Sequence, residues 1–204
     1  MKKTLITTTL TAAVLLVGCS APANDADPNF ESLPAADTPA PEPVEETIPE
    51  VEVNDRGSVV MQPGETEILY DLEDDSDLLS FTVNSVEVNP ECTGERSDDP
   101  ENGTFVVFEA EVDSDITAAD HYLDPGLIFN SAGYRVIDED GTTRGESPNT
   151  SAAHNCFPES DSFPINLGPG EKASGKVVFD VPVDSGSLLM DIDPSQGLQY
   201  EWEF

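Results

Sequence analysis

Histidine and cysteine side chains suit nucleophilic chemistry, and this chain carries both types side by side. His154, Asn155 and Cys156 supply the residue types of a thiol hydrolase. Adjacency in sequence, however, does not bring a base within hydrogen-bond distance of a nucleophile. The chain has no Gly-x-Ser-x-Gly turn, no His-Glu-x-x-His helix and no phosphate-binding glycine loop. Among 42 acidic residues some pair of carboxylates is inevitable, so a pair does not indicate a glycosidase. We therefore predict that the chain is not an enzyme and needs no cofactor.

Acidic residues occupy alternate positions in one short stretch, as they do in calcium-binding loops. The candidate ligands for a divalent cation are Asp71, Glu73, Asp75 and Asp77. The stretch fails the EF-hand requirement, because Ser76 stands where the loop needs glycine and Thr82 stands where it needs a bidentate glutamate. The sequence therefore favours a solvated acidic turn and predicts no metal site.

The N-terminus has the features of an export signal. Lys2 and Lys3 precede an uncharged apolar stretch, residues 5–17, which is shorter than the roughly 20 residues that a membrane-spanning helix needs. The residues that follow, Leu16-Val17-Gly18-Cys19, resemble the lipobox of bacterial lipoproteins. This resemblance implies that residues 1–18 are a signal peptide and that Cys19 carries fatty acyl chains such as palmitate, which anchor the protein to the outer face of the cell membrane. The alternative is an ordinary secretory signal that ends near a cysteine.

Export would leave Cys92 and Cys156 in an oxidising compartment, where two cysteines in one domain predict a disulfide. Closing the loop between Cys92 and Cys156 would stabilise the fold by about 4 kcal/mol. We expect the bond to join two loops, one after a strand and one within residues 147–164. The alternative is a metal site that includes His121 and His154, but the spacings match no zinc template.

Residues 19–56 are expected to form a disordered tether. Within them, residues 20–56 hold 7 of the 17 prolines and ten acidic residues, with almost no aromatic side chain. Such a segment cannot bury enough apolar surface to offset its chain entropy. Its reach lies between ~35 Å as a flexible chain and ~100 Å when extended. The tether would therefore hold a folded domain away from the membrane surface.

The net charge of −34 excludes one class of partner. Removal of Lys2 and Lys3 with the signal peptide would leave 6 basic residues against 42 acidic ones. A field of this sign repels phosphate backbones, so we expect no nucleic acid partner. The acidity favours solubility or a salty exterior, where screening weakens the self-repulsion.

Residues 57–204 predict one all-β domain. The clearest strand is the last, in which Leu198, Tyr200, Trp202 and Phe204 alternate with polar residues. Further predicted strands are 79–83, 86–88, 105–112, 134–137, 177–181 and 188–192. The alternation changes phase at Asn84-Ser85, which indicates a β-bulge or a strand that changes sheets. No segment shows a helical period. This pattern predicts an antiparallel β-sandwich.

Residues from about 78 to 204 also resemble a known family, the telokin-like, immunoglobulin-fold domain of unknown function in secreted lipoproteins of Gram-positive bacteria. The resemblance is carried by Leu79–Val83 running into Val86–Val88, by Gly103–Phe108, by the Asp140-Gly141 turn after Tyr134, and by Pro169–Glu171 leading to Gly175–Pro182. It implies an extracytoplasmic immunoglobulin-like sandwich and brings no assigned chemistry.

Together these features predict a lipid-anchored, extracytoplasmic surface protein without enzymatic activity. Its sandwich would act as a structural module, or would bind an envelope protein or polymer. The alternative is a lipoprotein that binds a small ligand or a divalent cation beside a transporter. A concave pocket with convergent polar groups would favour this alternative, and a flat loop surface would favour the first function.

Overall fold

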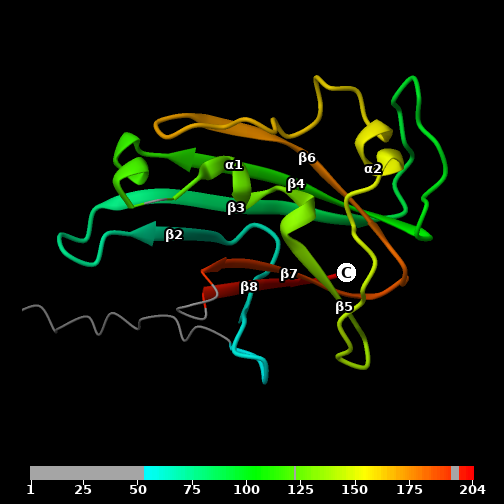
Figure 1. Ribbon diagram of the computed structural model, residues 1–204, viewed down its shortest axis with the longest axis horizontal. Helices are drawn as coiled ribbons and strands as arrows, with labels where there is room; N and C mark the ends of the chain where they lie inside the picture. The colour runs from blue at the N-terminus through cyan, green and yellow to red at the C-terminus, as the bar shows by residue number, and fades with distance from the viewer. Residues whose placement is uncertain (1–52, 122, 194–197) are drawn as a thin grey trace, which may run out of the picture. The chain divides into compact units, whose positions relative to one another are not determined.

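Two four-stranded sheets make up the folded part of the chain (Figure 1). The structure, a computed structural model, describes residues 53–121, 123–193 and 198–204. The strands are β1 (Val59–Val60), β2 (Thr66–Tyr70), β3 (Asp77–Val88), β4 (Thr104–Ser114), β5 (Tyr134–Asp138), β6 (Lys172–Val181), β7 (Gly186–Asp193) and β8 (Leu198–Glu203). Short helices join them: α1 (Pro125–Ile128), α2 (Ser151–Asn155) and the 3₁₀ helices η1 (Ile116–His121) and η2 (Ser131–Gly133). The prediction of an all-β sandwich is confirmed.

The second sheet, in the order β2-β3-β4-β6, is antiparallel throughout. Its register shifts between Val83 and Ser85, where the sequence changes phase. β3 pairs with β4 on both sides of this shift, so the irregularity is a bulge and the strand does not change sheets. The bulge lets Val83 and Val86 both face inward although they are three positions apart.

The first sheet, in the order β1-β8-β7-β5, departs from the antiparallel prediction at one edge. β5, β7 and β8 pair antiparallel, whereas the two residues of β1 pair parallel with Tyr200 and Glu201 of β8. The folded part also begins before Gly57, where the sequence placed its start. Val53 forms a bridge with Val59, and Asn54 and Arg56 contact β8.

Aromatic side chains from both sheets fill the space between them. Tyr200 and Trp202 of β8 meet Phe81 of β3, with ring centroids 5.1 and 6.3 Å apart. Phe108 of β4 contacts Phe179 of β6 at 4.8 Å. Edge-on arrangements at these distances add to the stabilisation from burial. These side chains belong to the core, as their spacing predicts.

Phe105 of β4 does not join this core. It lies on the outer face of β4 with Val107, in a second apolar cluster that includes Ala152, Ala153 and Cys156. The helix α2 therefore covers the outside of the second sheet, which explains why β4 is apolar on both faces. None of the helices in the described ranges is long and apolar enough to cross a membrane.

Candidate functional site

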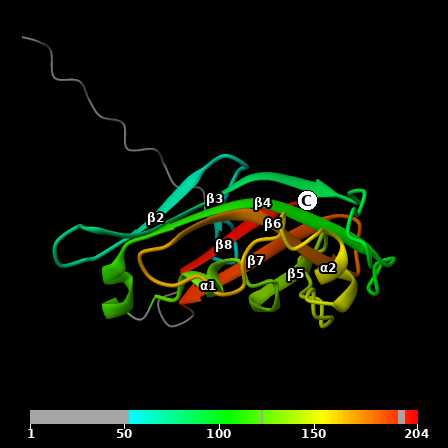
Figure 2. The same ribbon diagram turned by 90° about the horizontal axis from the view of Figure 1, so that it is seen from above.

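The helix α2 and the loop before β4 lie beside each other at one end of the sandwich (Figure 2). Thr150 caps the helix, since its Oγ1 accepts a hydrogen bond from the amide of Ala153 at 3.1 Å. The same hydroxyl donates to Asp180 of β6 at 2.7 Å. Two buried alanines, Ala152 and Ala153, let this short helix sit close against β4. The start of α2 is thereby fixed to the second sheet.

Asp180 is a fully buried carboxylate that organises this end. It accepts hydrogen bonds from the amides of Glu101 and Asn102, at 2.7 and 2.9 Å, in addition to the Thr150 hydroxyl. Asn102 Nδ2 donates in turn to the carbonyl of Asp180 at 2.7 Å. These bonds compensate the desolvation of the carboxylate and tie three separate segments together.

A disulfide joins Cys92 to Cys156 and holds the other end of α2. The amides of Thr93 and Gly94 both donate to the carbonyl of Cys156, at 2.8 and 2.9 Å. Gly94 permits this approach, because a Cβ there would lie 2.1 Å from the carbonyl oxygen of Asn155. Cys92 lies in a loop as expected, whereas Cys156 is the fully buried C-cap of a helix that the sequence did not predict.

The segment 158–167 runs from α2 along the edge of β6. The amide of Phe163 donates to the carbonyl of Lys176 at 2.9 Å, and the amide of Lys176 donates to the carbonyl of Asp161 at 2.8 Å. Gly175 makes room for this pairing, since a Cβ there would lie 2.6 Å from the nitrogen of Phe163. The segment therefore covers an otherwise free sheet edge.

Between α2, η2, β6 and the 158–167 segment the surface is hollowed. A narrower hollow of about 270 Å³ adjoins a wider one of about 800 Å³. Both are lined by His154, Ser162, Phe163, Pro164 and Ile165. The narrower hollow also has Asn130, Ser131, Asn149 and Lys176 in its wall, and the wider one has Arg96, Glu95 and Glu159. Polar groups from distant parts of the chain thus converge on one concave surface.

The basic side chains without an acidic partner also gather here. Arg56, Arg135, Arg144 and Lys172 each form a salt bridge with a carboxylate. Arg96 and Lys176 have no such partner among the described residues, and each lines one of the two hollows. Lys176 Nζ lies 4.9 Å from the ring centroid of Phe157. This contact steadies the ammonium group without neutralising it.

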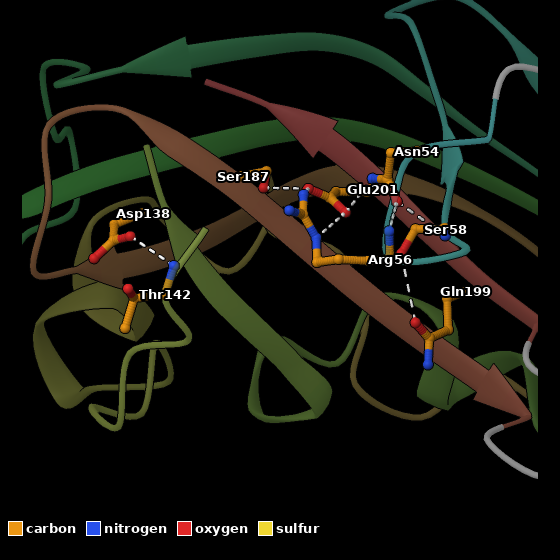
Figure 3. Close-up of polar contacts among 8 residues, drawn as sticks. All are labelled: Asn54, Arg56, Ser58, Asp138, Thr142, Ser187, Gln199 and Glu201. Carbon is orange, nitrogen blue, oxygen red and sulfur yellow. Dashed lines mark hydrogen bonds and ion pairs between the residues drawn. The ribbon is translucent and has the colours of Figure 1, made fainter. Parts of the chain in front are cut away.

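In a second polar cluster, Asn54, Arg56 and Ser187 all donate hydrogen bonds to the carboxylate of Glu201 (Figure 3). Glu201 lies on the face of β8 opposite Tyr200 and Trp202, and is 3% exposed. Burial acts to raise the pKa of Glu201, but hydrogen bonds from Arg56, Ser187 and Asn54 and the charge of Arg56 lower it below its ordinary value. These hydrogen bonds occupy the carboxylate of Glu201, and they fasten Asn54 and Arg56, which precede β1, to β8.

The structure does not bring the candidate acidic ligands, Asp71, Glu73, Asp75 and Asp77, together into a cation site. The turn between β2 and β3 uses its carboxylates internally, since Asp71 Oδ1 accepts from the amide of Glu73 at 2.8 Å and Asp74 Oδ1 accepts from the amide of Ser76 at 3.0 Å. His121 Nε2 lies 3.4 Å from Asp71. Within residues 53–121, 123–193 and 198–204, no three His, Cys, Asp or Glu side chains are placed to hold a metal ion, and this includes Asp75 and Asp77.

The remaining predicted site residues have separate positions. Cys92 and Cys156 share their disulfide, so neither offers a thiol to His154 here. His154 is exposed at the hollow and His121 ends η1. Cys19, its lipobox and the tether as far as residue 52 lie outside the described residues. The sequence analysis did not single out Asp180 or Lys176 as functional residues. The available signal was that these two charged residues flank the apolar residues Val177–Phe179 of β6.

Comparison with known proteins gives one similar structure. No family model matches the chain, and no curated protein matches it. Membership of the telokin-like family therefore stays a prediction. The chain is similar to a solved secreted protein from Mycobacterium tuberculosis, MPT63, with 15% sequence identity and a TM-score of 0.40 over 72% of this chain and 98% of that chain.

Proposed function

We propose that this chain is an exported lipoprotein without enzymatic activity, which is held at the outer face of the membrane by lipid on Cys19 and binds a small ligand at the end of its sandwich. The observation that carries the binding role is the double hollow beside α2, where groups from four segments converge. Concave sites with an apolar lining and a few convergent polar groups are the usual form of small-molecule sites. The hollow therefore favours a small ligand over a flat contact with an envelope protein or polymer.

The walls of the hollow are fastened as a binding site requires. The disulfide holds one end of α2, the Asp180 hydrogen bonds hold the other, and backbone pairing holds the 158–167 segment to β6. A preorganised wall loses less conformational entropy when a ligand binds. The disulfide also supports export, because such bonds persist in oxidising compartments.

The side chains at the hollow support binding more than catalysis. Ser162 Oγ donates to the carbonyl of Pro158 at 3.2 Å. Among the described residues, His154 forms no hydrogen bond with a serine side chain. A serine nucleophile needs a neighbouring base within hydrogen-bond distance. A divalent cation, the other ligand that the sequence allowed, would need oxygen ligands that the described residues do not bring together.

Fractionation tests the anchor. Wild type should be found with membranes, accessible to protease from outside and labelled by radioactive fatty acid, whereas Cys19→Ser should lose the label and leave the membrane fraction. A Cys19→Ser protein that stays membrane-bound and labelled would contradict the lipid anchor.

A screen of small polar and apolar fragments tests the hollow. Amide resonances of the Cys19→Ser chain should shift in a saturable manner at Ala153, Val177 and Val178, which all line the narrower hollow. Saturable shifts that occur only on the outer strand faces away from α2 would overturn the hollow as the binding site.

A further inference from the structure

The narrower hollow differs in charge from the rest of this acidic chain. It has 15 lining residues, and none is Asp or Glu, although the chain has 42 acidic residues. Its ionisable side chains are Lys176 and His154. The acids Glu95 and Glu159 line only the wider hollow, as does Arg96. The narrower hollow is therefore a locally basic surface within a molecule of net charge −34.

We infer that the narrower hollow binds a small organic anion, namely a carboxylate that carries an apolar group. This inference rests on the proposed function and specifies the ligand of the same site. Lys176 recognises the carboxylate, and Phe163 and Ile165 contact the apolar group.

Lys176 is suited to this role by its position. It is half-buried, its backbone is paired with Asp161 and Phe163, and its ammonium group lies over Phe157. Lys172, four residues earlier in the same strand, is instead exposed and paired with Asp113. A charge held in place without a partner loses little freedom when it meets a carboxylate.

The net negative charge of the protein does not prevent anion binding at this place. At physiological ionic strength the screening length is about 8 Å, so acids on distant faces contribute little. A carboxylate in direct contact with Lys176 is much less screened, because the two charges would lie well within this length. The same field would weaken anions that bind at the surface elsewhere, which gives the hollow its selectivity.

The size of the narrower hollow limits the ligand. The volume corresponds to about nine waters at ~30 Å³ each, hence to a ligand of roughly ten non-hydrogen atoms.

A pair of matched probes tests the charge requirement. N-acetyl-leucine has a carboxylate, an apolar side chain and an N–H donor, whereas N-acetyl-leucinamide has the same shape without the charge. In an NMR titration of the full chain carrying Cys19→Ser, the acid should shift the amides of Ala153 and Val178 in a saturable manner. The amide should bind at least about tenfold more weakly.

Three variants test which side chains determine binding of the acid. Lys176→Met keeps the apolar stem against Phe157 and should weaken the acid at least about tenfold, while the matched variant Lys172→Met should bind it as wild type does. Asn149→Asp adds a carboxylate to the wall and should abolish binding of the acid. Unfolding midpoints of all variants are measured alongside, so that a loss of folding is recognised.

The outcomes separate the two proposals. If the amide binds as tightly as the acid, or if Lys176→Met binds the acid unchanged, the anion inference is overturned and the hollow remains a site for small ligands. If neither probe gives saturable shifts at millimolar concentration, the anion inference also fails, and the fragment screen alone decides the binding function.

Discussion

Two buried carboxylates, Asp180 and Glu201, show what alternation along a strand does not reveal. Alternation places both on the outer faces of their strands, where acids are normally solvated. The structure buries them because distant segments cover them: Asn54 and Arg56 cover Glu201, and the loop before β4 covers Asp180. These pairs are separated by 78 to 147 residues, so no local pattern could predict them.

Glu201→Gln should destabilise the fold by about 1–3 kcal/mol at neutral pH, since it removes charged hydrogen bonds but Arg56 remains partly in water. The pKa of Glu201 lies below its ordinary value of 4.5. Its stabilising contribution is therefore complete above that pH and is lost as the pH falls through the lowered pKa. The difference in unfolding free energy between variant and wild type should shrink in acid, as urea unfolding at neutral and acidic pH would measure.

Glu203→Gln, at an exposed position on the same face of β8, is the matched control and should change stability little at either pH. An equal penalty for Glu201→Gln at neutral and at acidic pH would show that the charge of Glu201 contributes nothing.

Strand prediction succeeded where apolar residues alternate over several positions, as in β6, β7 and β8, and where the alternation changes phase at the bulge of β3. It failed for elements too short to show a period. β1 has two residues and α2 has five, and both form because other elements hold them. The hollow could not be predicted for the same reason, since the tertiary packing of α2 and the 158–167 segment creates it.

Gly175→Ala should loosen the 158–167 segment. The added Cβ would meet the backbone of Ser162 and Phe163 at 2.6 to 2.8 Å, so the segment must move away from β6 at a cost of about 1–3 kcal/mol. Hydrogen exchange should become faster at the amide of Phe163, which donates to Lys176. Ligand binding in the hollow should weaken as well.

Gly145→Ala is the control for this change, because a Cβ at Gly145 would meet nothing within 4 Å. It should be neutral or slightly stabilising through the unfolded chain. Unchanged exchange at Phe163 in Gly175→Ala would contradict the close packing of the segment on β6.

The charge of the whole molecule predicts its response to salt. Monovalent salt should raise the melting temperature, because it screens the repulsion among 42 acidic residues. Calcium at matched ionic strength should add no saturable shift, since the turn between β2 and β3 uses its carboxylates to bond its own amides. Thermal unfolding over a calcium series measures both effects. A saturable rise of several degrees that Asp75→Asn removes would instead establish a calcium site.

The proposed role of the molecule depends on residues 1–52, where charge, apolar length and the Leu16–Cys19 pattern predict processing and lipid attachment. Short linear signals of this kind are readable from sequence because enzymes recognise them as unfolded chain. The ligand of the hollow is not readable in this way, because it depends on which side chains the fold places around Lys176.

The intact mass of the protein extracted from membranes of the cells that produce it decides whether the chain is a lipoprotein. The expected mass is that of residues 19–204 with one disulfide and a diacylglyceryl group on Cys19, with or without a further acyl chain on the new amine. A chain that still begins at Met1, or a processed chain without lipid, would contradict the lipid anchor.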